Sequence, residues 1–194
     1  MTASQRRYSL VLASPSDRFV QAVMPFLPDN RYETPVLCTD AAAVRKLLSV
    51  QKMDLALISM PLPDEAGLSL ATDICAGSGM GVVLLTSAAR YQETSDRAAP
   101  FGVMTLQKPT SGQLLTQALG IACATRERLR RMEEKNASME EKMEEIRLVS
   151  HAKWVLIDQL KMSEPEAHRY IEKLAMDRCV TRRAVAQDIL SIYK

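Results

Sequence analysis

Short apolar runs alternate with amphipathic segments of helical periodicity over the first 109 residues. This alternation is typical of a parallel sheet whose strands are joined by crossover helices. We expect strands at 8–13, 32–37, 54–59, 81–86 and 102–107. We expect helices between them at 17–26, 40–50, 67–76 and 90–98. The sequence therefore predicts an α/β fold built on a five-stranded parallel sheet.

The composition is that of a globular protein without a membrane segment. A chain of 194 residues has room for one compact core and an appendage. No apolar run approaches the roughly 18 residues that suggest a membrane span. The apolar run after Arg6 and Arg7 is too short for a signal peptide, and we interpret it as the first strand. We therefore expect a cytoplasmic protein with no membrane partner.

The sulfur and imidazole side chains do not suggest a metal or cofactor. The histidines, His151 and His168, fall on helical segments without acid or thiol neighbours at ligand spacing. The cysteines are too scattered for a metal knuckle or a redox pair, and we interpret them as buried or neutral side chains: Cys38, Cys75, Cys123 and Cys179. We expect no cofactor and no metal.

Reactive side chains in such sheets lie at the carboxyl ends of the strands. At those ends this chain has Ala13 with Ser14, then Ser59, Thr86, and Lys108 followed by Pro109. On this pattern residues 6–120 resemble the response-regulator receiver domain, which has a flavodoxin-like fold. That family holds Mg²⁺ with an acid pair after the first strand and accepts phosphate on an aspartate after the third.

The resemblance keeps some features of the receiver pocket and loses its acids. Thr86 and Lys108 match the family, whereas Ala13 and Ser14 replace the acid pair and Ser59 replaces the acceptor. Mg²⁺ needs charged oxygen ligands, so we do not expect Ser59 to be phosphorylated. Asp17 is either a substitute metal ligand or an acid that complements a helix N-terminus. We interpret the domain as a degenerate receiver that serves association.

The segment 111–160 contains no proline and is expected to form one long helix. A seven-residue repeat predicts a left-handed coiled coil. Its a positions are Leu115, Ala122, Leu129, Asn136, Met143 and Ser150, and its d positions are Ala118, Thr125, Met132, Met139 and Ile146. We expect the dimer seam at Leu129, Met132, Asn136, Met139, Met143 and Ile146.

Asn136 at a central a position favours a parallel, two-stranded homodimer, in which the two amides pair. Charges at the flanking g and e positions agree in part, because Arg128 can face Glu133 of a second copy, whereas Lys142 would face Arg147. The alternative is a solvated single helix whose methionine stripe packs on its own receiver.

The C-terminal end is expected to be a three-helix bundle. The sequence Ser163 to Glu166 is a capping box that opens a helix to about Asp177, and Thr181 can cap a last helix. Residues 147–194 carry nine lysines and arginines against six acids, so the positive excess lies here. We divide the chain into a receiver at 1–110, a dimerisation helix at 111–146 and a bundle at 147–194.

The bundle resembles the ANTAR domain, the RNA-binding antiterminator module of the AmiR and NasT regulators. The matching stretches are IRLVSHAKWVLIDQL, SEPEAHRYIEKLAMD and TRRAVAQDIL. Trp154 departs from the family, which usually has glycine there, and Arg182 stands where leucine is common. Trp154 either packs between two copies or stacks on an RNA base.

The resemblance implies a dimer that binds leader-RNA hairpins and prevents a terminator from forming. Single charges on helices are usually solvated, but clustering favours a nucleic-acid role for some of them. The candidates for RNA binding are Lys153, Trp154, Lys173, Arg178, Arg182 and Arg183, with Arg169 a weaker one.

We expect a transcription antitermination regulator, not an enzyme, because no acid, base and nucleophile converge. Its signal would come from a sensor protein on the receiver or from control of dimerisation. The alternatives are a protein-interaction adaptor or signalling scaffold that has lost RNA binding, and a DNA-binding regulator.

Overall fold

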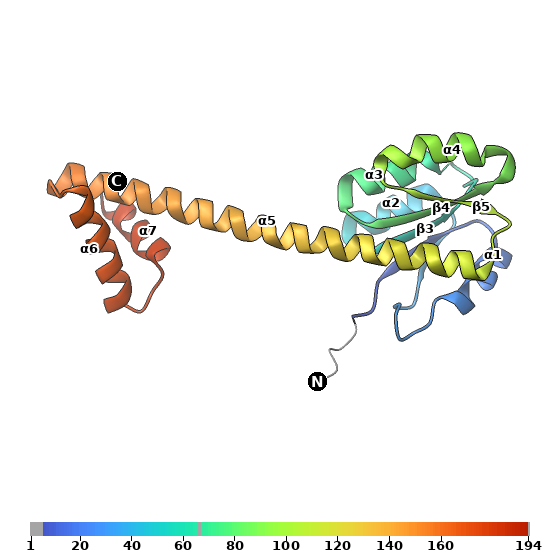
Figure 1. The fold of residues 1–194 in the computed structure, drawn as a ribbon, viewed down its shortest axis with the longest axis horizontal. Helices are drawn as coiled ribbons and strands as arrows, with labels where there is room; N and C mark the ends of the chain where they lie inside the picture. Colours follow the sequence, from blue (N-terminus) through green and yellow to red (C-terminus); the bar gives the residue numbers. More distant parts are fainter. Residues whose placement is uncertain (1–5, 66, 194) are drawn as a thin grey trace. The chain divides into compact units, whose positions relative to one another are not determined.

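The computed structural model of the protein describes residues 6–65 and 67–193 (Figure 1). The start of the expected first domain, residues 1–5, and Ala66 lie outside the described residues. The chain forms two compact units, one ending at Arg131 and the other beginning at Met132. Within the described part of the chain, no helix is long and apolar enough to cross a membrane.

The first unit is built on a five-stranded parallel sheet, as predicted, and its strand order is β2-β1-β3-β4-β5. Their bounds are β1 Leu10–Ala13, β2 Val36–Cys38, β3 Leu55–Ser59, β4 Gly81–Ser87 and β5 Met104–Lys108. The second strand is shorter than expected, because Pro35 has no N–H to donate to a ladder. Before it, only an isolated bridge joins Tyr8 to Tyr32.

Four helices connect the strands near the predicted positions. They are α1 Asp17–Val23, α2 Ala41–Val50, α3 Leu68–Ser78 and α4 Tyr91–Ala98. Short 3₁₀ turns follow α1, precede α4 and follow α4, at Met24–Phe26, Ala88–Arg90 and Ala99–Phe101. Ser16 and Asp40 start α1 and α2 by accepting hydrogen bonds from backbone N–H groups three residues later.

Alternate residues of each strand feed two separate cores, one on each face of the sheet. Ala56 and Ile58 of β3 pack with residues of α2, α3 and α4. Leu55 and Leu57 of the same strand pack with α1 and with the start of α5, on the opposite face (Figure 1). Both faces of the sheet are therefore covered, as expected for parallel strands.

The long helix α5 runs without a break from Gly112 to Leu160, as predicted. Its first turns belong to the core of the first unit, where its buried residues are Leu115, Ala118, Leu119, Ala122 and Cys123. A side chain at Gly81 would meet the Ala122 carbonyl oxygen at 2.6 Å, so glycine permits this close packing. The compact unit consequently extends past residue 110, and the first a and d positions face the sheet and not a second helix.

The second unit combines the end of α5 with α6 Glu164–Asp177 and α7 Arg182–Ile192. The capping box is present, since the Glu166 carboxylate accepts hydrogen bonds from the Ser163 N–H and hydroxyl at 2.8 and 2.7 Å. Thr181 caps α7 by accepting from the Ala184 N–H. The predicted three-helix bundle is confirmed, and its buried core consists of Ala152, Leu156, Ala167, Ile171, Ala175, Val185, Ala186 and Ile189.

Some large apolar residues of these three helices lie outside the bundle core. Leu160, Tyr170 and Ile192 are exposed, whereas the smaller Ala167 and Ala186 are fully buried. The short side chains of Ala167 and Ala186 let the three helices pack closely.

Candidate functional site

The predicted receiver-pocket residues converge at the carboxyl edge of the sheet. Ala13, Ser14, Ser59 and Thr86 are all buried there, on three adjacent strands and the loop after β1. Lys108 ends β5, and its ammonium group reaches across to β3. The sequence prediction that these side chains share one edge is therefore supported by their positions.

Lys108 is held by neutral oxygen atoms. Its Nζ donates hydrogen bonds to Ser59 Oγ at 3.2 Å and to the Met60 carbonyl oxygen. Burial lowers the pKa of Lys108, because the charged ammonium loses solvation. Among the described residues, no carboxylate forms an ion pair with this lysine in the pocket. Within the part of the chain that the structure describes, the arrangement offers one partly buried cation and no carboxylate bonded to it.

Two acids in the loops that follow β2 and β3 serve as helix caps. Asp64 accepts hydrogen bonds from the Ala41 and Ala42 N–H groups, both at 2.9 Å, and Asp40 accepts from the Ala43 N–H. These backbone donors hold the pKa of Asp64 below its usual value. Asp17 is exposed in the first turn of α1, which favours its interpretation as a helix-terminal acid.

No group of three or more histidine, cysteine or acidic residues that could hold a metal is found within residues 6–65 and 67–193. His168 nevertheless has an acid neighbour that we did not expect, since its Nε2 lies 3.3 Å from Glu172 one helical turn away. The four cysteines are free thiols, of which Cys38 and Cys123 are buried and Cys179 is exposed.

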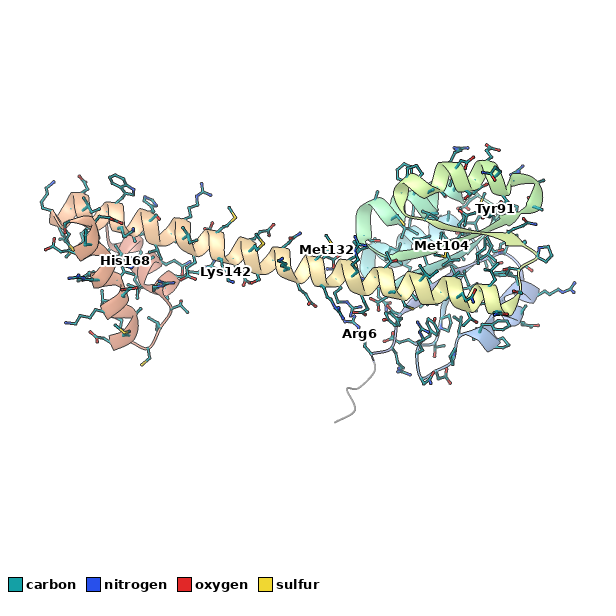
Figure 2. The ribbon with its side chains drawn as sticks, in the orientation of Figure 1. Arg6, Tyr91, Met104, Met132, Lys142 and His168 are labelled. Carbon is teal, nitrogen blue, oxygen red and sulfur yellow. The ribbon has the colours of Figure 1, made fainter. Side chains whose placement is uncertain are left out.

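A buried ionic cluster at the opposite end of β3 was not predicted. Asp54 Oδ1 lies 3.2 Å from Arg130 Nη2, 3.5 Å from Arg126 Nε and 3.8 Å from Arg6, which is labelled in Figure 2. Asp54 Oδ2 also accepts a hydrogen bond from the Ser9 N–H at 3.2 Å. The cluster ties α5 to the amino end of the sheet. A signal for it was available, because an acid beginning an apolar run must be paired when buried.

The predicted seam on α5 carries large apolar side chains that the single chain leaves exposed. Met132, which is labelled in Figure 2, is 50% exposed, and Met143 and Ile146 are 68% and 66% exposed. Asn136 and Met139 are also exposed, whereas Leu129 is partly buried. Exposed apolar side chains that repeat at heptad spacing favour a second helix as their partner.

The RNA-binding candidates fall into separate groups on the helical unit. Arg178 pairs with Asp188 at 3.2 Å, and Arg182 contacts Glu145 at 3.3 Å and Glu172 at 3.8 Å. Lys153 is mostly buried, and its Nζ contacts Glu164 at 2.7 Å. This ion pair lowers the pKa of Glu164. Lys153 therefore has a role in joining α5 to α6.

Three further candidates are exposed, namely Trp154, Lys173 and Arg183. Lys173 lies in a shallow hollow with Lys161, Arg169 and the exposed Tyr170. Lys161 and Tyr170 were missed by the sequence reasoning, although an aromatic ring among basic residues is a recognised pattern for single-stranded nucleic acid. The arginines near the start of α7 do not line this hollow.

A second hollow, of about 470 Å³, lies between α5, α6 and α7. Ile146 and Val149 of α5 form apolar lining, and its basic lining includes Lys142, Lys153, His168 and Arg182. Figure 2 labels Lys142 on α5 and His168 on α6. We call this hollow the interhelical groove.

The sequence of residues 137–190 matches the ANTAR domain. Over 165 residues the chain is 29% identical to the transcriptional regulatory protein PdtaR of Mycobacterium tuberculosis, covering 84% of this chain and 80% of that protein.

Solved structures with a similar fold include the signal receiver domain of an HD domain-containing protein from Pseudomonas fluorescens Pf-5. The likeness has a TM-score of 0.59 at 23% identity, and it covers 68% of this chain and 97% of that one. A second similar structure is a CheY-like receiver domain protein from Methanospirillum hungatei JF-1, with a TM-score of 0.56 at 18% identity. This match covers 63% of this chain and 98% of that one. At these identities the comparison establishes the receiver fold of the first unit.

Proposed function

We propose, from the premise that residues 137–190 are an ANTAR domain in a chain with a receiver fold, that this protein regulates transcription antitermination. It binds hairpins in leader RNA as a homodimer, and its receiver works without phosphorylation. Action on nascent transcripts places it in the cytoplasm. The observation that carries the proposal is the ANTAR match together with the basic hollow on α6.

The basic hollow suits an unpaired loop nucleotide. Lys161, Arg169 and Lys173 supply positive charge, and Tyr170 offers an exposed ring on which a base can stack. Proteins recognise unstacked bases in hairpin loops by such stacking, while lysine and arginine contact the phosphates. Arg183 and the ion-paired Arg178 and Arg182 provide further positive charge for the RNA backbone.

Dimerisation is supported by the exposed heptad residues between Leu129 and Ile146. Burying this stripe against a second copy would remove four large apolar side chains from water, namely Met132, Met139, Met143 and Ile146. A dimer presents two basic hollows, which raises the affinity for an RNA with two hairpins through effective concentration.

Phosphorylation independence is supported by the chemistry of the pocket. The Lys108 ammonium donates hydrogen bonds to the Ser59 hydroxyl and the Met60 carbonyl oxygen. The side chains of Ala13 and Ser14, at the positions of the acid pair, carry no carboxylate. Mg²⁺ would have to give up hydration for uncharged ligands, which is unfavourable. The signal then enters through a sensor protein that docks on the receiver, or through control of dimerisation.

Filter binding tests the proposal. A leader RNA with two hairpins should bind more tightly than random RNA of equal length, with affinity that falls as salt rises. Lys173→Ala should weaken RNA binding, and it should lower the slope of log affinity against log salt concentration by about one. The matched control is Lys46→Ala, at an exposed residue of the receiver.

Tyr170→Ala should weaken RNA binding more than Tyr170→Phe, because phenylalanine keeps the aromatic ring. Equal affinity for both RNAs would contradict the proposal and favour a protein-interaction adaptor.

A further inference from the structure

Trp154 is the single tryptophan of the chain, and 70% of it is exposed. Large aromatic side chains each bury about 150–250 Å² where they pack, so an exposed indole on an ordered helix indicates a binding role. Trp154 is not among the residues that line the interhelical groove. Within its own chain, the Trp154 indole therefore does not pack into this groove.

The heptad register relates this indole to the groove of a second copy. With Asn136, Met143 and Ser150 at a, Val149 is at position g and Trp154 is at position e of the next heptad. In a parallel two-stranded coiled coil, the g residue of one helix lies beside the e residue of its partner five positions later. Trp154 of one copy would thus lie beside Val149 of the other.

Val149 and its neighbour Ile146 are the apolar lining of the interhelical groove. Within one chain, Val149 and Trp154 are five residues apart, about 1.4 turns of helix, so they point in different directions from the same axis. The indole of the same chain therefore does not fill this groove. In a parallel dimer, the indole from a second copy would approach this groove from the seam side.

Two cations that line the groove are held in ion pairs. Arg182 contacts Glu145 at 3.3 Å, and Lys153 contacts Glu164 at 2.7 Å. A guanidinium or ammonium group beside an indole face adds a cation–π attraction to apolar burial. The ion pairs leave these cations ordered, so little side-chain entropy is lost when the ring binds.

We propose that in the homodimer Trp154 of each copy inserts into the interhelical groove of the other. The two reciprocal contacts extend the seam beyond Ile146 and lock the two ANTAR bundles to each other. The inference rests on the dimer of the proposed function and adds a specific role for this residue. It assigns Trp154 to packing between copies and not to base stacking.

Intrinsic fluorescence of the full chain tests this directly, because its emission comes from one tryptophan. Emission and acrylamide quenching are measured without RNA over a dilution series, and sedimentation equilibrium gives the mass of the same samples. We expect a blue-shifted, weakly quenched emission that moves to the red as the dimer dissociates. Met139→Glu, which breaks the seam, should give the exposed emission at every concentration.

Val149→Ser is the variant for the groove, with its fold checked by circular dichroism. It should keep the dimer mass while shifting the emission to the red. A dimer with exposed emission that is insensitive to Val149→Ser would overturn the insertion and leave the RNA-binding function standing. If the Trp154 indole is shielded from acrylamide only when hairpin RNA is added, the insertion is overturned in favour of stacking on an RNA base. A monomer at all concentrations would overturn both the insertion and the proposed dimer.

Discussion

Lys108 Nζ donates a hydrogen bond to Ser59 Oγ over 3.2 Å, joining two strand ends that are 49 residues apart in sequence. In receiver domains this edge of the sheet carries acids, and here it carries hydroxyl groups and a carbonyl oxygen. The lysine therefore holds the ends of β5 and β3 together through uncharged oxygen atoms. This relationship supports the proposal that the receiver works without phosphorylation.

Restoring the acids should restore metal binding. The triple variant Ala13→Asp, Ser14→Asp and Ser59→Asp should be less stable than the wild type without metal, because three carboxylates repel one another. Added Mg²⁺ should raise the Tm of this variant and leave the wild-type Tm unchanged. Differential scanning fluorimetry with and without Mg²⁺ measures both. The same Tm rise in the wild type would show that its pocket already binds the ion.

Removing the buried acid at the other end of β3 should destabilise the receiver. Asp54→Ala removes the carboxylate that lies 3.2 Å from Arg130 Nη2. It also removes the acceptor of the Ser9 N–H hydrogen bond. Removing one partner of a buried ion pair lowers the free energy of unfolding by about 3 kcal/mol, because the other charge stays buried without its partner. Urea unfolding of the wild type and the variant measures this loss. The exposed acid Asp96→Ala is the control and should change stability by less than about 0.5 kcal/mol. A similar small change at Asp54 would show that the cluster is not stabilising.

In the proposed dimer, the amide of Asn136 should lower the stability of the helix pair and restrict the assembly to two helices. Asn136→Leu should raise the free energy of dissociation and allow larger assemblies, since a single polar a residue specifies the two-stranded state. Sedimentation equilibrium of both proteins gives the masses, and thermal unfolding at several concentrations gives the stabilities. If the variant changes neither mass nor the concentration dependence of Tm, residue 136 does not lie in a helix pair.

The helical unit should lose stability in acid through its capping box. Hydrogen bonds from the Ser163 N–H and hydroxyl hold the pKa of Glu166 below its usual value. The carboxylate therefore stabilises the fold fully above the usual glutamate pKa, and this contribution is lost as pH falls through the lower, folded value. Urea unfolding of the wild type from neutral to acidic pH should show the loss. Glu166→Gln should be less stable at neutral pH and less sensitive to pH, and an unchanged pH profile in this variant would assign the dependence to other groups.

The sequence allowed the sheet, the long helix and the bundle to be predicted, because each depends on a local pattern. Apolar periodicity and caps such as Ser163 and Thr181 act within a few residues, so they can be read along the chain. The packing of Leu115 and Ala122 on the sheet was assigned to the coiled coil instead, since the two environments use overlapping helical spacings.

The remaining features of the sites depend on contacts between distant segments. Asp54 meets Arg130 across 76 residues, and Tyr170 joins Lys161 and Lys173 only because α6 turns back beside the end of α5. Charges of this kind are plentiful on helices, and their pairing is decided by the fold. The sequence therefore located the basic unit but did not separate Lys153, which is clamped by Glu164, from the exposed Lys173.

The central claim is that a dimer binds RNA without a phosphoryl signal, and one titration tests it most directly. The affinity of the purified chain for a two-hairpin leader RNA is measured with and without acetyl phosphate and Mg²⁺, beside the seam variant Met139→Glu. The account predicts tight, salt-sensitive binding by the wild type that the phosphoryl donor does not change, and weaker binding by the variant. Binding that appears only after treatment with acetyl phosphate and Mg²⁺, or that is as tight in the seam variant as in the wild type, would contradict it.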